Sequence, residues 1–538
     1  MHNNSKKQIT QPIWLALAIG VIIGAQFVDK PIKTKKAGGA IEKMREVLLS
    51  IDNNYVDSVD VDFLVEEGIK GMLKELDPHT SYIPISEINQ VHAQLNGNYD
   101  GIGIEFYVLN DSITVVRPIK GGPSDEAGIE IGDRIITVNG EAVAGIDITS
   151  KGVTTRLLGE KGSQVELIIY RPVSQEKLPF TIKRGNIYQS TVDAFYMVDE
   201  QTGYIKLSRF GNSSAKEVKV AIKELLNNGM TQLVFDLQSN PGGYLKEAEK
   251  IADEFIKENQ IIVSQKGKMG KFNDEFKSSS GGVFEDNPLI VLVDEYSASA
   301  SEILAGALQD NDRALIVGRR SFGKGLVQLP ISLSDGSELR LTIARYYTPS
   351  GRSIQKSYEK VNTEYAHDIS SRFAHGEFYN ADSIQFPDSL KFTTLNGRTV
   401  YGGGGIMPDF FVPLDTTRTS SFYVKVFNNG VLKALVLSYY TANKERLQEI
   451  TLEDYINTFS MDAHIEKSIE KACRQMDVNF SDNGYSGAKE LISVYCKAEI
   501  ARLRWGGNEY YQLINPESNL SFNKSVHLFD QASSLNDN

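Results

Sequence analysis

The chain has few cysteine and histidine residues for its length, and this excludes several kinds of site. Only two of its 538 residues are cysteine and seven are histidine. No C-x-x-C pair and no cluster of histidine with cysteine occurs, so we expect no zinc site. No histidine lies in a motif that pairs with a nucleophile, and G-x-S-x-G is absent, so an α/β-hydrolase elbow is not supported. We expect no metal and no other cofactor.

The two cysteines, Cys473 and Cys496, both lie near the C-terminus. In an oxidising compartment they would close a loop of about 24 residues, and such a disulfide is worth roughly 3 kcal/mol when unstrained. Two buried free thiols are the alternative, and the sequence leaves both open.

Positive charge and long apolar runs are also scarce. The net charge of −12 argues against a nucleic-acid-binding protein, which normally carries a basic face. The only long apolar run is Ile13 to Val28, about 24 Å long as a helix and preceded by Lys6 and Lys7. Cleavage after Ala25 would put Ile23 at −3, which favours an uncleaved membrane anchor over a cleaved signal peptide.

With either reading of this segment we expect the rest of the chain to be exported. The expected location is the cell envelope. An anchor in the inner membrane would leave the remainder of the chain in the periplasm or extracytoplasmic space.

At this length the chain exceeds one hydrophobic core, and composition shifts suggest its divisions. Residues 1–38 comprise a short tip, the apolar segment and a lysine-rich linker, and residues 39–95 are expected to be a helical cap. In the cap, 41–51 and 61–76 show helical periodicity, and Pro78 ends the second helix.

Between residues 96 and 187 the pattern changes to short strands. Gly101-Ile-Gly-Ile104 precedes a strand, and further strands, a helix at 149–158 and a strand at 165–170 follow. The order closely resembles that of a PDZ domain, with Gly101, Ile102, Gly103 and Ile104 at the position of the carboxylate-binding loop. Glycines there leave N–H groups open to a peptide's terminal carboxylate, and the strand edge can pair with the peptide.

Residues 188–415 alternate strands with helices, as in a layered β/α core. Strands are expected at 203–210, 233–237, 289–293, 314–318 and 338–347, and helices at 214–227, 246–257 and 301–309. A polar insertion at 356–399 interrupts the core before Gly405-Ile-Met-Pro-Asp409. Residues 416–538 are expected to form a helical C-terminal extension.

Ser299 is the first candidate for chemistry. Ser299-Ala-Ser-Glu302 is a capping box, and most S-x-x-E segments do nothing more than start a helix. Here, however, a buried strand leads to a serine flanked by alanines at a helix start. Small neighbours let a carbonyl approach, and a helix N-terminus stabilises a developing oxyanion. By composition alone Ser297 and Ser301 are rival nucleophiles.

Lys324 is the second candidate, 25 residues downstream in Gly323-Lys-Gly325. A lysine in a glycine turn is usually a solvated charge, with a pKa near 10.4. Burial would lower that pKa and make the neutral amine a base for a serine hydroxyl. On a strand, residues 324, 326 and 328 share one face, so Gln328 could orient the amine.

Three segments resemble the C-terminal processing peptidases, or tail-specific proteases: Val293 to Asp310, Ser321 to Gln328 and Leu341 to Gln355. Asn240-Pro-Gly-Gly243 and Gly405-Ile-Met-Pro-Asp409 also fit that family. The resemblance covers about residues 40 to 415 and implies an α+β / α/β multidomain protein. Its parts are a crotonase-like (ClpP/crotonase) core, an inserted-type PDZ domain, an N-terminal helical cap and a C-terminal helical extension.

The resemblance also assigns roles to residues. Ser299 matches the nucleophile, Lys324 the general base and Gln328 the residue that positions the lysine. The N–H groups of Gly243 and Ala300 match the oxyanion hole. The implied activity is that of a serine endopeptidase that cleaves exported proteins near their C-termini, with the PDZ domain binding the tail.

Two alternatives remain. One is a non-catalytic, membrane-tethered PDZ scaffold that binds protein C-termini. The other is a regulatory protease that makes a second cut in a signalling pathway. Protein or peptide substrates and the membrane are the expected partners, nucleic acid is not, and assembly into a homo-oligomer is left open.

Overall fold

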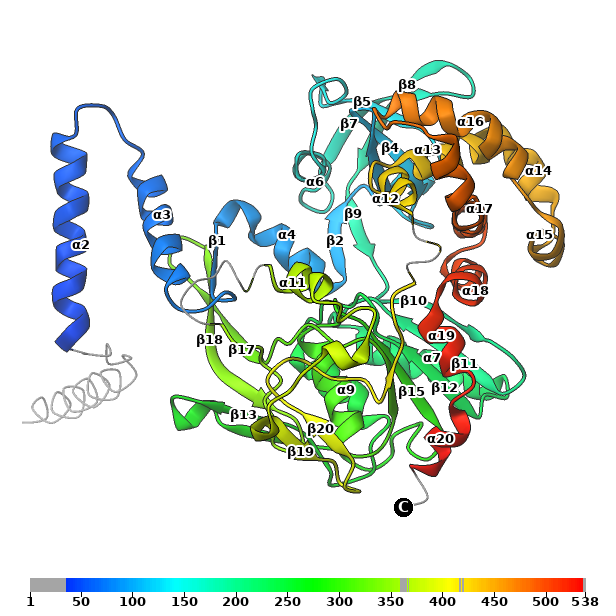
Figure 1. Ribbon diagram of the computed structural model, residues 1–538. Coiled ribbons are helices and arrows are strands. Elements are labelled where there is room, and N and C mark those ends of the chain that lie inside the picture. The colour runs from blue at the N-terminus through cyan, green and yellow to red at the C-terminus, as the bar shows by residue number, and fades with distance from the viewer. Residues whose placement is uncertain (1–34, 359–364, 366, 416–417, 419, 536–538) are drawn as a thin grey trace, which may run out of the picture. The chain divides into compact units, whose positions relative to one another are not determined.

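The structure, a computed structural model, describes residues 35–358, 365, 367–415, 418 and 420–535 (Figure 1). The predicted anchor at 13–28 lies outside these residues. Within them, no helix combines the length and apolar character needed to cross a membrane. The chain divides into two compact units, one up to Met72 and one from Leu73 onward. The first contains α2 (Lys35–Asn54) and most of α3 (Val61–Lys74).

The second unit begins with a short connection and a small antiparallel domain. β1 (Ser81–Ile83) and α4 (Ile85–Asn96) lead to β2 (Asn98–Gly101), which pairs with β9 (Gly185–Tyr188). Between them lies a sheet in the order β3-β4-β5-β7-β8, with β6 beside β5 and with helices α5 and α6. The bounds are β3 (Ile104–Leu109), β4 (Ser112–Pro118), α5 (Pro123–Glu126), β5 (Arg134–Val138), β6 (Glu141–Ala142), α6 (Ser150–Leu157), β7 (Gln164–Arg171) and β8 (Glu176–Lys183).

A six-stranded sheet forms the centre of the second unit, in the order β10-β11-β12-β15-β16-β21. Only β10 runs antiparallel to its neighbour in this sheet. Its strands are β10 (Val192–Met197), β11 (Thr202–Leu207), β12 (Gln232–Asp236), β15 (Leu289–Val293), β16 (Leu315–Gly318) and β21 (Phe410–Phe411). All of β15 is buried, because helices cover both faces of a parallel sheet.

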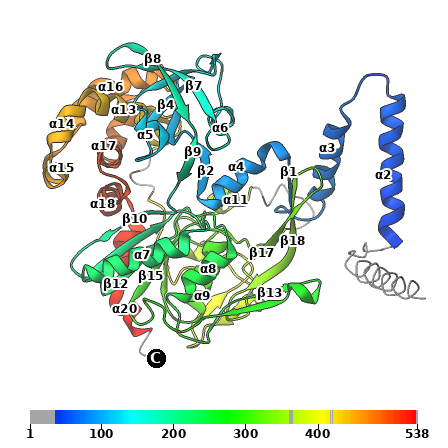
Figure 2. The ribbon, with the colours of Figure 1, turned by 180° about the vertical axis from the view of Figure 1, so that it is seen from behind.

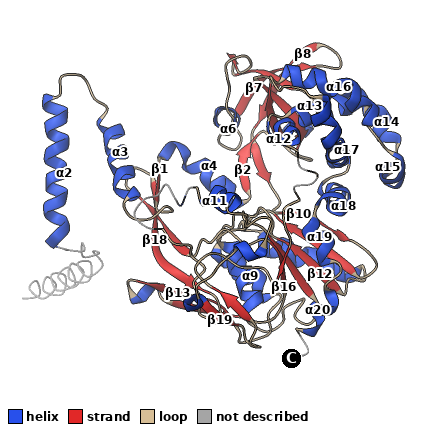
Figure 3. Ribbon diagram, in the orientation of Figure 1, coloured by secondary structure: helices blue, strands red, loops and turns tan. Residues whose placement is uncertain are grey.

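Alternate residues of these strands face two different apolar clusters. On one side they pack with α7 (Ser214–Asn227), α8 (Leu245–Asp253) and α9 (Ala300–Asp310). On the other they pack with α19 (Leu520–Ser525) and α20 (Phe529–Ser534), close to the C-terminus. Figures 2 and 3 show the strands between these two sets of helices. The mixed α/β character predicted from the sequence is confirmed.

A second sheet lies beside the first, in the order β1-β18-β13-β14, with β17 also paired to β18. Its strands are β13 (Ile261–Gly267), β14 (Asp274–Lys277), β17 (Leu326–Ser332) and β18 (Glu338–Tyr347), and the short helix η1 (Gly270–Phe272) joins β13 to β14. The insertion predicted at 356–399 contains α11 (Asp368–Ala374), η2 (Ala381–Ser383), η3 (Asp388–Leu390) and β19 (Lys391–Thr393), and β20 (Thr399–Tyr401) pairs with β19.

Helices follow from residue 421 onward. They are α12 (Ser421–Asn428), α13 (Val431–Ala442), α14 (Lys444–Glu449), α15 (Leu452–Thr458), α16 (Asp462–Gln475), α17 (Asp482–Arg504) and α18 (Gly507–Ser518), before α19 and α20. Cys473 and Cys496 are free and buried in the apolar cluster of α12 to α17. The sequence is compatible with either a disulfide or two buried thiols, and the structure contains the two thiols.

Candidate active site

Ser299 lies where the loop after β15 enters α9. It is the N-cap residue of that helix, with φ 58° and ψ −112°. A residue other than glycine in such a conformation carries strain of about 1–3 kcal/mol, and strain of this kind is common at active sites. The backbone therefore presents this serine in a conformation that an ordinary helix cap does not require.

The two rival serines have other contacts. Ser297 and Ser301 are completely buried, whereas Ser299 is half-buried. The Ser297 hydroxyl donates to the Leu237 carbonyl (2.8 Å) and the Ser301 hydroxyl to the Asn240 carbonyl (2.9 Å). Both hydroxyls thus hold neighbouring loops together.

Glu302 connects the serine loop to the lysine loop. Its Oε2 accepts the N–H groups of Ser299 and Lys324, each at 2.8 Å. Its Oε1 accepts the Gly323 N–H and the Ser321 hydroxyl, each at 2.6 Å. Burial raises the pKa of this carboxyl, and the four hydrogen bonds oppose that rise. The sequence predicts only the bond to Ser299, since the other three come from residues about 20 positions away.

Lys324 and Gln328 meet as expected. Lys324 Nζ donates to Gln328 Oε1 (3.0 Å), and Gln328 Nε2 donates to the carbonyl of His79. Burial lowers the pKa of Lys324, and the nearby charge of Glu302 partly offsets this. The predicted simple strand alternation is wrong in detail, because β17 begins at Leu326 and its register shifts between Val327 and Gln328.

Ser299 and Lys324 are linked through shared partners. Within the described residues the Lys324 amine bonds Gln328, and no hydrogen bond joins it to the Ser299 hydroxyl. Besides Glu302, Tyr346 connects the two segments: its hydroxyl reaches the carbonyl oxygens of Ser299 (3.1 Å) and Lys324. The two loops are therefore held side by side at their backbones, while the Lys324 amine is held by Gln328.

The loop at 239–243 packs directly against Ser299. A Cβ on Gly242 would lie 2.8 Å from Ser299 Cβ and 2.9 Å from the Ala300 nitrogen. A Cβ on Gly243 would lie 2.1 Å from the carbonyl oxygen of Phe210. Within the described residues neither the Gly243 nor the Ala300 N–H has a hydrogen-bond partner. Two open donors thus lie in segments that contact the serine.

The loop at 77–80 also belongs to the site, although the sequence does not predict this. Asp77 accepts the N–H groups of His79 and Thr80, each at 2.9 Å, and Thr342 on β18 also donates to it. Burial, reinforced by the charge of Lys324, lowers the pKa of His79 to about 4, so its ring is neutral. The sequence marked this segment only as the end of a helix, and nothing local indicates that its carbonyl holds Gln328.

The predicted carboxylate loop lines a small cavity. Gly101 ends β2, Ile104 begins β3, and Gly103 has a φ of 75°. Within the described residues the N–H groups of Ile102 and Gly103 donate no hydrogen bond. The cavity beside them measures about 190 Å³, and most of its wall is apolar: Ile102, Ile104, Phe106, Leu157 and Leu158.

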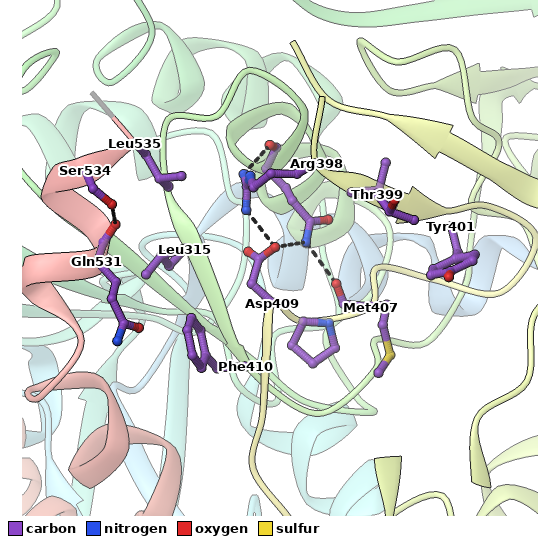
Figure 4. A pocket seen from close by; sticks show the side chains of 13 residues that line it. Leu315, Arg398, Thr399, Tyr401, Met407, Asp409, Phe410, Gln531, Ser534 and Leu535 are labelled. Carbon is purple, nitrogen blue, oxygen red and sulfur yellow. Dashed lines mark hydrogen bonds and ion pairs between the residues drawn. The ribbon is translucent and has the colours of Figure 1, made fainter. Parts of the chain in front are cut away.

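A larger cavity, about 590 Å³, lies away from Ser299 (Figure 4). It lies beside Gln309, near the C-terminal end of α9, and an eleven-residue helix places that end about 15 Å from the N-cap. Arg398 on its wall is already paired with Asp312 (2.5 Å) and Asp409 (2.7 Å). Size therefore does not identify the reactive site in this protein.

The chain resembles known proteins over most of its length. Residues 201–365 match the family described as "Peptidase family S41", residues 101–183 match "PDZ domain", and residues 422–506 match a "Family of unknown function (DUF8443)". The chain is 36% identical over 435 residues to the carboxy-terminal processing protease CtpB of Bacillus subtilis (strain 168), a match covering 80% of this chain and 86% of that protein.

Two further proteins are similar to this chain. A carboxy-terminal-processing protease of Bartonella bacilliformis is 37% identical over 321 residues, which cover 59% of this chain and 72% of that one. The solved photosystem II D1 C-terminal processing protease is 28% identical, with a TM-score of 0.36, over 70% of this chain and 88% of that one. The chain therefore belongs to the carboxy-terminal processing proteases of peptidase family S41, serine-type peptidases, and it carries a PDZ domain.

Proposed function

We propose that the enzyme is an endopeptidase in which Ser299 is the nucleophile and Lys324 the general base. The observation that carries this proposal is the geometry of Glu302, which binds the backbone N–H of both residues. A lysine with a lowered pKa, oriented by Gln328, is suited to take a serine proton. From the membership in peptidase family S41 we also propose a crotonase-like core for residues 188–415.

The reaction is acyl transfer. Neutral Lys324 takes the Ser299 hydroxyl proton as the serine oxygen bonds the peptide carbonyl carbon. The N–H groups of Gly243 and Ala300 stabilise the oxyanion, an effect worth about 3 kcal/mol per donor in comparable sites. Lys324 then gives its proton to the leaving amine, and water releases the acyl group from Ser299.

The PDZ domain is proposed to bind the substrate tail. The open N–H groups of Ile102 and Gly103 suit a terminal carboxylate, and the apolar cavity beside them suits an apolar last side chain. The peptide would pair with β3, which is the edge strand of its sheet. The proposed substrates are exported proteins, cut near their C-termini by an enzyme anchored through residues 13–28 in the cell envelope.

Substitution of Ser299 and Lys324 tests the dyad. Ser299→Ala and Lys324→Ala should each abolish cleavage of an unstructured peptide with an apolar C-terminus, while circular dichroism and the unfolding midpoint stay near those of the wild type. Turnover retained in either variant would refute the dyad. A protein that binds tails but has no Ser299-dependent cleavage would instead be the PDZ scaffold.

Amidation of the substrate tests the tail-binding role. Because Ile102 and Gly103 would bind the free carboxylate, an amidated peptide should show a KM at least about tenfold higher, the equivalent of roughly 1.4 kcal/mol. Equal processing of free and amidated peptides would remove the PDZ domain from substrate selection. Substrates that accumulate with the Ser299→Ala enzyme would separate general tail processing from a regulatory second cut.

A further inference from the structure

The helices at 422–506, which match a family of unknown function, share a core with the PDZ domain. Val116 on β4 is only 1% exposed and belongs to the same buried cluster as Val431, Leu435 and Tyr495. Tyr107, Leu109 and Ile131 of the PDZ domain pack against that cluster. The outer face of the PDZ sheet is therefore covered by apolar side chains from helices more than 300 residues away in the sequence.

Arg502 on α17 forms the polar centre of this contact. Its guanidinium donates to Glu105 Oε2 (3.1 Å) and to the Tyr107 hydroxyl (3.2 Å), both on β3, and to Glu499 (3.0 Å) on its own helix. Burial raises the pKa of Glu105, but Arg117 and Arg502 more than offset this and lower it overall. Glu105 therefore stays charged, and removal of Arg502 would leave that half-buried charge with Arg117 alone.

A second contact lies at the turn before β5. Lys444 binds Glu130, which also accepts Arg171 (3.1 Å). Gly132 lies so close to α13 that a Cβ there would be 2.4 Å from Thr441 Cγ2. The helices and the PDZ domain thus touch through an apolar cluster, a partly buried arginine and the close approach of the Gly132 backbone to α13.

These contacts lie behind the strand that forms the tail groove. Ile104 and Phe106 line the groove, whereas Glu105 and Tyr107 face the helices, as the alternation of side chains along a strand requires. One strand therefore has the proposed tail site on one face and the helices on the other. Loss of the contacts between the helices and β3 would therefore remove the packing behind the strand that lines the groove.

The same helices are attached to the protease sheet. α17 leads into α18 through Gly506 and Gly507, and a Cβ on Gly507 would lie 2.1 Å from the Asp193 carbonyl oxygen. Asn508 accepts the Phe195 N–H on β10 (2.8 Å). Figures 1 and 2 show α17 beside the PDZ strands and α18 beside β10. The chain from Arg502 to Asn508 therefore joins the PDZ domain to the catalytic sheet.

We propose that residues 422–506 are a built-in partner of the PDZ domain, which stays bound to its outer face throughout turnover and connects that domain to the catalytic sheet. This role rests on the proposed function of the groove. It predicts that the PDZ domain need not detach from the helices for cleavage to occur.

A disulfide between the two parts tests this directly. A Cβ at position 132 would lie 3.8 Å from Thr441 Cβ, a separation that suits a disulfide. In the full chain Gly132→Cys/Thr441→Cys should form this bond on mild oxidation, and turnover of a tail peptide should stay within about twofold of the reduced form and of each single variant. Failure of the bond to form in the folded variant, or a tenfold loss on oxidation that reductant reverses, would overturn the proposal.

Arg502→Met provides an independent test that needs no new bond. It should raise amide hydrogen exchange in residues 104–117 at least about fivefold, because the support behind β3 is weakened. The matched control is Arg474→Met on α16, where the arginine side chain is 73% exposed; this variant should leave exchange unchanged. Unchanged exchange with Arg502→Met would contradict the proposal. Both bond formation and exchange can be measured even if the enzyme proves not to select tails through its PDZ domain.

Discussion

Lys324 has surroundings that disfavour its charged form, and this makes a prediction about pH. Burial lowers its pKa from an ordinary value of 10.5, against the opposing effect of Glu302. The proposed base is the neutral amine, so kcat/KM should rise as the pH increases and level off above the Lys324 pKa, with the inflection below 10.5. The measurement is a pH–rate profile with a peptide that has no titrating side chains. A kcat/KM that falls as the pH rises toward the Lys324 pKa would argue against a lysine base.

Glu302 makes a sharper prediction at the same scale. Glutamine has a similar shape but only one acceptor oxygen. Its NH₂ group would face N–H or O–H groups that now donate hydrogen bonds to Glu302. Loss of hydrogen bonds to a charged group costs about 1.5–3 kcal/mol each. We expect Glu302→Gln to lower kcat at least about 100-fold with little change in KM, because the residue positions Ser299 and Lys324 and does not touch the substrate. Glu258→Gln, an exposed site, is the control.

At the scale of elements, the close packing of the 239–243 loop against α9 can be tested at Gly242. Its φ is 96°, and a Cβ would lie 2.6 Å from the Ala298 carbonyl oxygen. Gly242→Ala should therefore push the loop away from Ser299 and lower kcat at least about tenfold. Gly281→Ala is a matched control, since its φ is 94° but nothing lies within 4 Å of the new methyl. A similar loss of kcat in both variants would show that backbone strain alone, and not the clash with the Ser299 loop, is responsible.

Elements with strong local signals are predicted well from the sequence. α7 spans residues 214–227 and β15 spans 289–293, as expected, because an amphipathic repeat and a continuous apolar run specify them. α8 was predicted to reach residue 257 but ends at Asp253. There the N–H of Phe255 bonds the Ala252 carbonyl three residues back, which tightens the last turn, and no residue type in the segment marks that change.

At the scale of the whole molecule, contacts between distant segments were beyond prediction. Composition suggested a helical tail, but nothing in it indicates that α19 and α20 return to cover the catalytic sheet. The same holds for the carbonyl of His79, which binds Gln328 from 249 positions away. Such partners share no periodicity or motif, and only packing of the complete chain brings them together. The choice of Ser299 over its neighbours likewise depended on family resemblance.

The return of the C-terminal helices makes the last prediction. Phe522 on α19 is 3% exposed and packs edge-on against Tyr204 of β11, with ring centroids 5.6 Å apart. Phe522→Ala should lower the free energy of unfolding by about 3–5 kcal/mol, since it leaves a cavity against the sheet. Leu520→Ala, at a position 38% exposed, should change it by less than about 1 kcal/mol. Denaturant midpoints measure both. If the two variants are equally stable, the contact between Phe522 and the sheet contributes little to folding. If Phe522→Ala is the less stable, the C-terminal helices are part of the core that stabilises the protease sheet, because they cover its second apolar face.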